Sequence, residues 1–275
     1  MARANKWSSA AARRLRDLAG GSVTTEQAVA IVVERALGDS PTVPTQLVEL
    51  ASRFRVMRIL AEDVYFSGEL RRVEDGYEIA YSKYQSRVRA RFTIAHEIAH
   101  AILESSGPNA PKVGKELERI CDMLAVEILM PRAVFWSELV RVGFSANAVL
   151  QLSRTFQTSV AATAIRCAEL IEQRLKQRIS VFEVHRETVT WAYGNVRRGP
   201  VTGLERVIRE PVRAALGGKS GFERLWFSTP PRVGDWTLEW ERLGRDDRAL
   251  FLLYSQRQLD ALSSLGTHRM LSAGI

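Results

Sequence analysis

Hydrophobic positions near the start of the chain recur at the spacing of helices. Residues 22–37 predict a helix with one apolar side, which Thr24 or Thr25 caps and Gly38 ends. Residues 45–55 predict a second helix, because their apolar side chains fall on one face. The first part of the chain is therefore expected to be helical.

The pattern then changes to that of strands. The stretches 56–60 and 63–68 are rich in apolar and aromatic residues and predict two strands. Residues 69–82 predict a hairpin, because Asp75-Gly76 suits a tight turn and the apolar residues that follow it alternate.

Helical spacing returns in the middle of the chain. The stretch "RFTIAHEIAHAIL", residues 91–103, predicts a helix with Thr93 as its N-cap. A second helix, at about 115–129, is expected to end before Pro131, and residues 134–175 have helical spacing throughout.

Strand-like segments follow from about residue 178, with one helix among them. We expect the strands at 179–185, 188–194, 224–228, 236–240 and 249–255, and the helix at 202–216 with an interruption at Pro211. Such a succession of helices and strands predicts the α+β class.

Composition and charge describe a globular chain with a basic excess. The chain has 275 residues, 46% of them hydrophobic and 25% charged, and a net charge of +8. The excess is diffuse except for one N-terminal cluster, which predicts a solvated, partly disordered tail, with weak contact to nucleic acid as the alternative. This cluster consists of Arg3, Lys6, Arg13, Arg14 and Arg16.

Cysteine content and hydropathy bear on the compartment. Cys121 and Cys167 are too few for a disulfide framework, which favours a reducing cytosol. The sequence has neither a long apolar run nor the apolar core of a signal peptide, so we expect a cytoplasmic protein without a membrane partner.

The residues that carry candidate chemistry lie in the helix at 91–103. His96 and His100 are four residues apart, so both imidazoles lie on the same side of a helix. Glu97 lies near the same rim, where its carboxylate can take a proton from an attacking water. This is the H-E-x-x-H pattern of a zinc site, for which the alternative is a helix with two surface histidines.

A catalytic zinc needs a third protein ligand, and the next helix offers carboxylates. Glu118 and Asp122 are four apart on one face of that helix. We assign Glu118 as the third ligand and Asp122 as the acceptor for the outer ring nitrogen of a histidine, with His96 the favoured one. Glu127, on a different arc of the helix, is the competing ligand.

Together these segments resemble the ImmA/IrrE family of zinc metallopeptidases. The matching stretches are "RFTIAHEIAHAIL", then "ERICDMLAVEILMP", then the helical "LSRTFQTSVAATAIRCAEL", in that order within residues 45–170. The sequence departs from the family at Cys121, where alanine is usual; we expect an inert buried thiol there.

The resemblance implies a gluzincin-like core with His96, His100 and Glu118 as Zn²⁺ ligands and Glu97 as catalytic base. It also implies a regulatory protease that cuts or inactivates a helix-turn-helix repressor in a stress or mobile-element response. The expected organisation is a basic tail and helix over 1–42, a zincin-like metallopeptidase core over 43–132, a helix-turn-helix-like segment over 133–176, and an α+β domain, similar to GAF or PAS sensors, over 177–275.

Two features of the expected reaction remain open at the level of sequence. The oxyanion needs a second donor, for which Tyr81, Tyr84 and His185 are the candidates. An extended substrate is expected to pair with a strand edge, and the stretch 77–82 is the candidate.

A DNA-binding or ligand-sensing transcription regulator with a non-catalytic zinc site is the alternative function. Residues 144–170 have the rhythm of a helix-turn-helix, with a turn at Thr158-Ser159. The second helix of this pair carries only Arg166 as a cation before Arg174, whereas a recognition helix offers more groups to phosphates and bases. We therefore interpret the segment as a structural helical pair.

Overall fold

The fold is taken from a computed structural model of the chain. It describes residues 9–21, 23–39, 41–104, 114–176, 179–194, 196, 198–200, 206–217, 220–227, 234–243 and 247–255. The chain divides into two compact units, the first made of 1–135 with 155–158 and the second of 136–154 with 159–275. The helical segment therefore belongs mostly with the C-terminal strands, unlike the expected boundary near residue 176.

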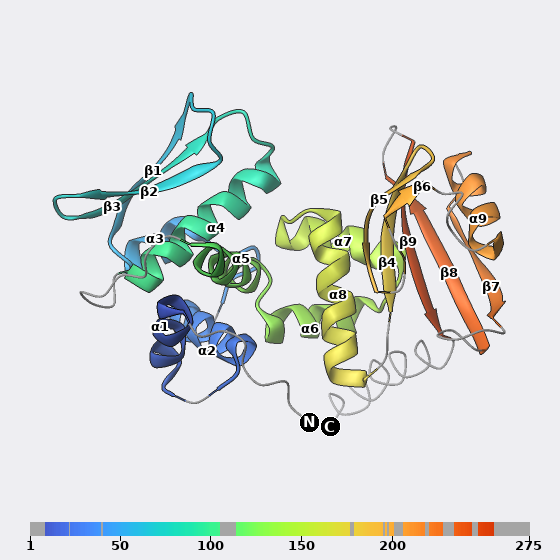
Figure 1. The fold of residues 1–275 in the computed structure, drawn as a ribbon, viewed down its shortest axis with the longest axis horizontal. Coiled ribbons are helices and arrows are strands. Elements are labelled where there is room, and N and C mark those ends of the chain that lie inside the picture. Colours follow the sequence, from blue (N-terminus) through green and yellow to red (C-terminus); the bar gives the residue numbers. More distant parts are fainter. Residues whose placement is uncertain are drawn as a thin grey trace, which may run out of the picture. The chain divides into compact units, whose positions relative to one another are not determined.

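The first unit combines five helices and one small sheet among its described residues (Figure 1). Its helices are α1 (Ala10–Ala19), α2 (Thr25–Leu37), α3 (Leu47–Arg53), α4 (Arg87–Glu104) and α5 (Lys115–Leu129). Its strands are β1 (Val56–Glu62), β2 (Gly68–Val73) and β3 (Gly76–Ser82), in the order β1-β3-β2.

The sheet of the first unit is mixed. β2 and β3 form the expected antiparallel hairpin, while β1 runs parallel to β3. The expected strand at 63–68 is wrong, because β2 begins only at Gly68 and the residues before it form a loop. Tyr65 and Phe66 in this loop are 108% and 41% exposed, so their aromatic character reflects no burial in a strand.

Helix α1 corrects the expectation of a disordered tail. The Ser9 hydroxyl accepts a hydrogen bond from the backbone N–H of Ala12 and so caps the helix. Ala11, Ala12, Leu15 and Ala19 are buried, while α1 packs against α2 and α5. The arginines of the basic cluster thus lie partly on an ordered helix; Arg3 and Lys6 lie outside the described residues.

Helices α4 and α5 form the centre of the first unit and pack against each other. The apolar side of α4 buries Ile98, Ala99 and Ile102, and that of α5 buries Ile120 and Leu124. The sheet contacts α4 mainly through β2 and β3. The two helices that carry the candidate chemistry are therefore held from both sides by buried apolar contacts.

The second unit contains three helices followed by a sheet with one further helix (Figure 1). The helices are α6 (Arg132–Val142), most of which belongs to this unit, α7 (Ala146–Phe156), α8 (Val160–Leu175) and α9 (Arg206–Leu216). The strands are β4 (Ser180–His185), β5 (Thr188–Tyr193), β6 (Gly199–Pro200), β7 (Gly221–Phe227), β8 (Gly234–Arg242) and β9 (Arg248–Ser255).

The second sheet has the order β6-β5-β4-β9-β8-β7 and is antiparallel throughout. One face buries Phe182, Leu238 and Phe251 against α9, and α8 contacts β4 and β5. Pro211 lies inside α9 without ending it, and the expected start of this helix, 202–205, lies outside the described residues. The α+β class expected from the sequence is confirmed.

Within the described residues, no helix has both the length and the apolar character needed to cross a membrane.

Candidate metal centre

Helix α4 carries the histidine pair and begins earlier than the sequence suggested. It starts at Arg87, where the Ser86 hydroxyl accepts a hydrogen bond from the backbone N–H of Arg89 at 3.4 Å. Thr93 as N-cap is therefore wrong. Its buried hydroxyl donates a 2.9 Å hydrogen bond to Gln85 instead.

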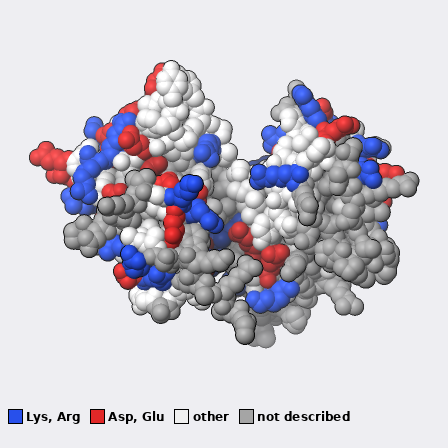
Figure 2. Space-filling model, viewed as in Figure 1, with Lys and Arg blue, Asp and Glu red and all other residues white. Residues whose placement is uncertain are grey.

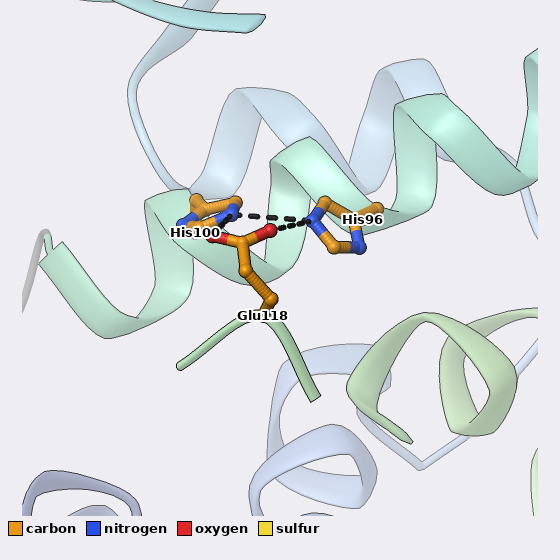
Figure 3. A group of neighbouring side chains, drawn as sticks. All are labelled: His96, His100 and Glu118. Carbon is orange, nitrogen blue, oxygen red and sulfur yellow. Dashed lines mark hydrogen bonds and ion pairs between the residues drawn. The ribbon is translucent and has the colours of Figure 1, made fainter. Parts of the chain in front are cut away.

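Three side chains from α4 and α5 meet at one point (Figure 3). His96 Nε2 lies 3.2 Å from Glu118 Oε2 and 3.2 Å from His100 Nε2, and His100 Nε2 lies 3.7 Å from Glu118 Oε1. Two ligands that each lie about 2.05 Å from a tetrahedral zinc are about 3.3 Å apart. The spacing of these donor atoms therefore fits one small divalent ion.

The chemistry of the donors fits zinc as well as their spacing does. Two imidazole nitrogens and one carboxylate oxygen form a set that zinc accepts in catalytic sites, where a fourth position stays open. His96 and His100 are partly buried, so the apolar packing of α4 restricts their rings. The three residues are the ones that the sequence singled out as ligands.

Asp122 lies on the outer side of His96. Its Oδ1 is 2.9 Å from His96 Nδ1, the ring nitrogen that faces away from the donor cluster. When that nitrogen donates, Nε2 carries a lone pair and is directed at the cluster. The arrangement is possible because Glu118 and Asp122 are one turn apart on α5.

Glu97 lies beside the cluster and is only 7% exposed. Its carboxylate accepts a hydrogen bond from the backbone N–H of Leu70 in β2. Gly68 in the same strand lies so close that a Cβ there would be 3.1 Å from Glu97 Oε1 and 2.3 Å from Thr93 Cγ2. Strand β2 thus fixes Glu97 from the side opposite its own helix.

Burial dominates the electrostatics of Glu97. Desolvation raises the pKa of this carboxyl to about 7; nearby His96 lowers it and Glu118 raises it. A carboxyl poised near neutral pH can both accept and release a proton, which suits a general base that later acts as an acid.

The two histidines differ in their electrostatics. Burial lowers the pKa of His96, but the hydrogen bond to Asp122 and the charges of Glu97, Asp122 and Glu118 outweigh it, so that the net shift is upward. Burial and the neighbouring His96 lower the pKa of His100. Both shifts apply to the cluster without a bound ion.

Comparison with known proteins assigns this region to a family. Residues 49–168 match the IrrE N-terminal-like domain, a peptidase family. A 90-residue stretch is 30% identical to the "Radiation response metalloprotease IrrE" of Deinococcus radiodurans. The resemblance to the ImmA/IrrE family is confirmed.

The extent of these matches is limited. The stretch shared with the Deinococcus protein covers 30% of this chain and 27% of that protein's length. A "Mycobacterium tuberculosis transcriptional regulator" is similar in structure with a TM-score of 0.49 and 13% identity, over 90% of this chain and 82% of that one.

The other candidate residues within 49–168 are not among the three clustered donors. Glu127 is buried and binds Arg132, whose backbone N–H lies 2.8 Å from Glu127 Oε1. Tyr84 is exposed and donates a hydrogen bond to Asp63 at 2.9 Å. Tyr81 lies opposite Gly68 in the β2–β3 ladder, so its side chain shares the sheet face that points to α4.

Two further expectations are corrected or clarified by the topology. The stretch 77–82 cannot pair with a substrate, because β3 is hydrogen-bonded to β1 on one side and to β2 on the other. The edge strand beside Glu97 is β2. His185 lies at the end of β4 in the second unit and is not one of the three clustered ligands.

The helix-turn-helix-like segment has the expected elements, with Ser159 capping α8. Its one cation before Arg174, Arg166, is 5% exposed and lies 4.0 Å from Glu169. Arg166 is therefore not available to a nucleic-acid backbone. On the face drawn in Figure 2, the described basic side chains of the first unit are interspersed with acidic ones.

Sequence reasoning missed the role of β2. The backbone N–H of Leu70 and the absent side chain of Gly68 carry no side-chain chemistry, so no motif could mark them. The only signal that the sequence offers is a glycine at the start of a strand in the hairpin that precedes the histidine helix.

Proposed function

We propose that the protein is a zinc metalloendopeptidase that hydrolyses a peptide bond in another protein, with His96, His100 and Glu118 holding the metal. The proposal is carried by one observation. Donor atoms from two helices, α4 and α5, lie within 4.8 Å of one another, with the buried carboxylate of Glu97 next to them. The match of residues 49–168 to a peptidase family supports it.

The chain's own residues divide the work of hydrolysis. When bound, zinc lowers the pKa of a water ligand and polarises the scissile carbonyl. Glu97 takes a proton from the attacking water and delivers it to the leaving amine. Asp122 keeps His96 in one tautomer, and Leu70 keeps the Glu97 carboxylate in place through its N–H.

The metal assignment is tested by composition. Purified protein should contain close to one zinc per chain, and His96→Ala should lose it, because one of three protein ligands is removed. Wild-type protein that binds no zinc from a zinc-supplemented buffer would contradict the proposal.

The catalytic assignment is tested by a change that keeps the metal. Glu97→Gln should retain zinc and lose peptide cleavage, since the amide cannot accept the proton. Glu104→Gln, at the end of the same helix, is the matched control and should leave both unchanged. A Glu97→Gln protein with full cleavage activity would show that Glu97 is not the base.

We further propose that the substrate is a helix-turn-helix repressor, that its cleavage relieves repression, and that the protein acts in a reducing cytosol. The substrate class is supported by the similarity of this chain to a radiation response metalloprotease. The compartment is supported by Cys121 and Cys167, which are both free and buried. The test is co-expression with the repressor encoded nearest to this gene. A cleaved repressor with wild type but not with Glu97→Gln supports the proposal, and an intact repressor with both rejects this substrate.

A further inference from the structure

The second unit contains a pocket that has no part in the proposed hydrolysis. Its volume is about 590 Å³, within the range of sites that hold small molecules. Thr237, Glu239 and Glu241 of β8 line it, and because they alternate along the strand they share one face of the sheet. Phe144 and Ser145, just before α7, line another side.

Two carboxylates set the charge of this pocket. Glu239 Oε1 accepts the N–H of Ala146 at 2.8 Å, and Oε2 accepts the hydroxyl of Tyr254 at 3.2 Å. Glu241 accepts the hydroxyl of Ser220 at 2.9 Å. The three donors to these carboxylates, one backbone N–H and two hydroxyls, are neutral groups.

Burial and neighbouring groups set the pKa of Glu239. Burial raises its pKa, the hydrogen bonds from Ala146 and Tyr254 lower it, and the charge of Glu241 raises it again. Arg224 is exposed and also lines the pocket; as the cross-strand partner of Thr237 it projects from the same face of the sheet. The described lining therefore includes two carboxylates and one guanidinium.

Aromatic rings accompany the carboxylates. Phe144 and Tyr254 meet edge to face at 5.7 Å between ring centroids, and both line the pocket. Aromatic rings attract cations through the negative charge of their faces, most strongly where water is excluded. Carboxylates and aromatic rings together favour an organic cation over an anion or a neutral sugar.

We propose that this pocket binds a small organic cation with two ammonium groups, such as a linear diamine. Glu239 and Glu241 are two residues apart on one strand, so their backbone positions are separated by about 6.7 Å. A short diamine can place one ammonium at each carboxylate, with its carbon chain against Phe144 and Tyr254. The site would make the second unit a ligand-binding domain, independently of the peptidase reaction.

The test measures binding to the full chain by isothermal titration calorimetry at moderate ionic strength. The probe is 1,4-diaminobutane, and 1,4-butanediol serves as the neutral analogue of similar length. Glu241→Gln should weaken diamine binding by about tenfold, the factor that corresponds to about 1.4 kcal/mol. Glu223→Gln, an exposed glutamate whose cross-strand partner Leu238 lies on the other face, is the matched control.

The outcomes separate a built site from non-specific attraction. Diamine binding that weakens in Glu241→Gln but not in Glu223→Gln, with no diol binding, supports the proposal. Absence of diamine binding at millimolar concentration overturns it, as does equal weakening by both substitutions. Glu239→Gln is a second variant; its circular dichroism is checked first, because Glu239 also accepts the α7 N–H. The measurement can be made in Glu97→Gln protein, so its result does not depend on peptidase activity.

Discussion

The contact between β2 and α4 leads to a sharp prediction for Gly68→Ala. An added Cβ would lie 2.3 Å from the Thr93 methyl carbon, whereas carbon atoms in contact prefer about 3.5 Å or more. The shortfall is about 1 Å. Thr93 cannot easily give way, because it is buried in a helix and its hydroxyl is bonded to Gln85. The strain should therefore move β2 away from α4.

The expected losses of stability and activity follow from overpacking and from the displacement of β2 relative to Glu97. Inserting one carbon into a packed site costs about 1–3 kcal/mol of unfolding free energy. A shift of about 1 Å at β2 would pull the Leu70 N–H from the Glu97 carboxylate, and misplacement of that size lowers activity by about 100-fold. Zinc content should not change, because no ligand is touched.

The assay compares denaturant unfolding, zinc content and cleavage rate among four proteins. These are the wild type, Gly68→Ala, the double variant Gly68→Ala/Thr93→Ser and a control variant. Thr93→Ser removes the clashing methyl but keeps the hydroxyl, so the double variant Gly68→Ala/Thr93→Ser should regain most of the activity lost by Gly68→Ala. Glu74→Ala, in the exposed turn after β2, is the control for changes on the hairpin. If Gly68→Ala is inactive and Thr93→Ser does not rescue it, the clash is not the cause and the reasoning is refuted.

Four further results are expected. Glu118→Gln should lose zinc, whereas Glu127→Gln should keep it and reduce stability by about 1–3 kcal/mol through the weakened contact to Arg132; zinc analysis and unfolding distinguish the two carboxylates. Asp122→Asn should lower zinc affinity by about 10- to 100-fold, measured by competition with a chelator. In chelated protein, the pKa of Glu97 is raised from 4.5 to about 7, so the folded state binds more protons in this window. The Glu97 contribution to stability should therefore fall by up to about 3 kcal/mol as pH rises from 4.5 to 7, and Glu97→Gln should remove this contribution in unfolding titrations.

The residues of the donor cluster could be predicted from the sequence because helix periodicity fixes which side chains share a face. Four-residue spacing places His96 above His100, and the same spacing places Glu118 above Asp122. What the sequence could not supply was the approach of the two helices, since this depends on buried contacts such as those of Ile98 with its surroundings. The resemblance to a known family bridged that gap.

The errors arose where local composition and tertiary context disagree. Thr93 looked like an N-cap because a threonine hydroxyl can accept a free backbone N–H, yet the helix extends back to Arg87 on the support of Ser86. Residues 63–68 are aromatic without being buried. Helix α1 was overlooked because its buried side is mostly alanine between arginines, and only packing on α2 and α5 explains its order.

The order of strands in the first sheet is the remaining property that no local pattern encodes, and it decides where a substrate can bind. β3 has partners on both sides, so only β1 and β2 offer free edges among the described strands. β1 is separated from β2 by β3, whereas β2 contacts α4 and donates the Leu70 N–H to Glu97. An extended peptide that pairs with β2 would therefore lie next to the Glu97 carboxylate, while one that pairs with β1 would not. The strand that contacts the proposed base is thus also the free edge nearest to it, so we expect a change in β2 to affect substrate affinity and turnover together.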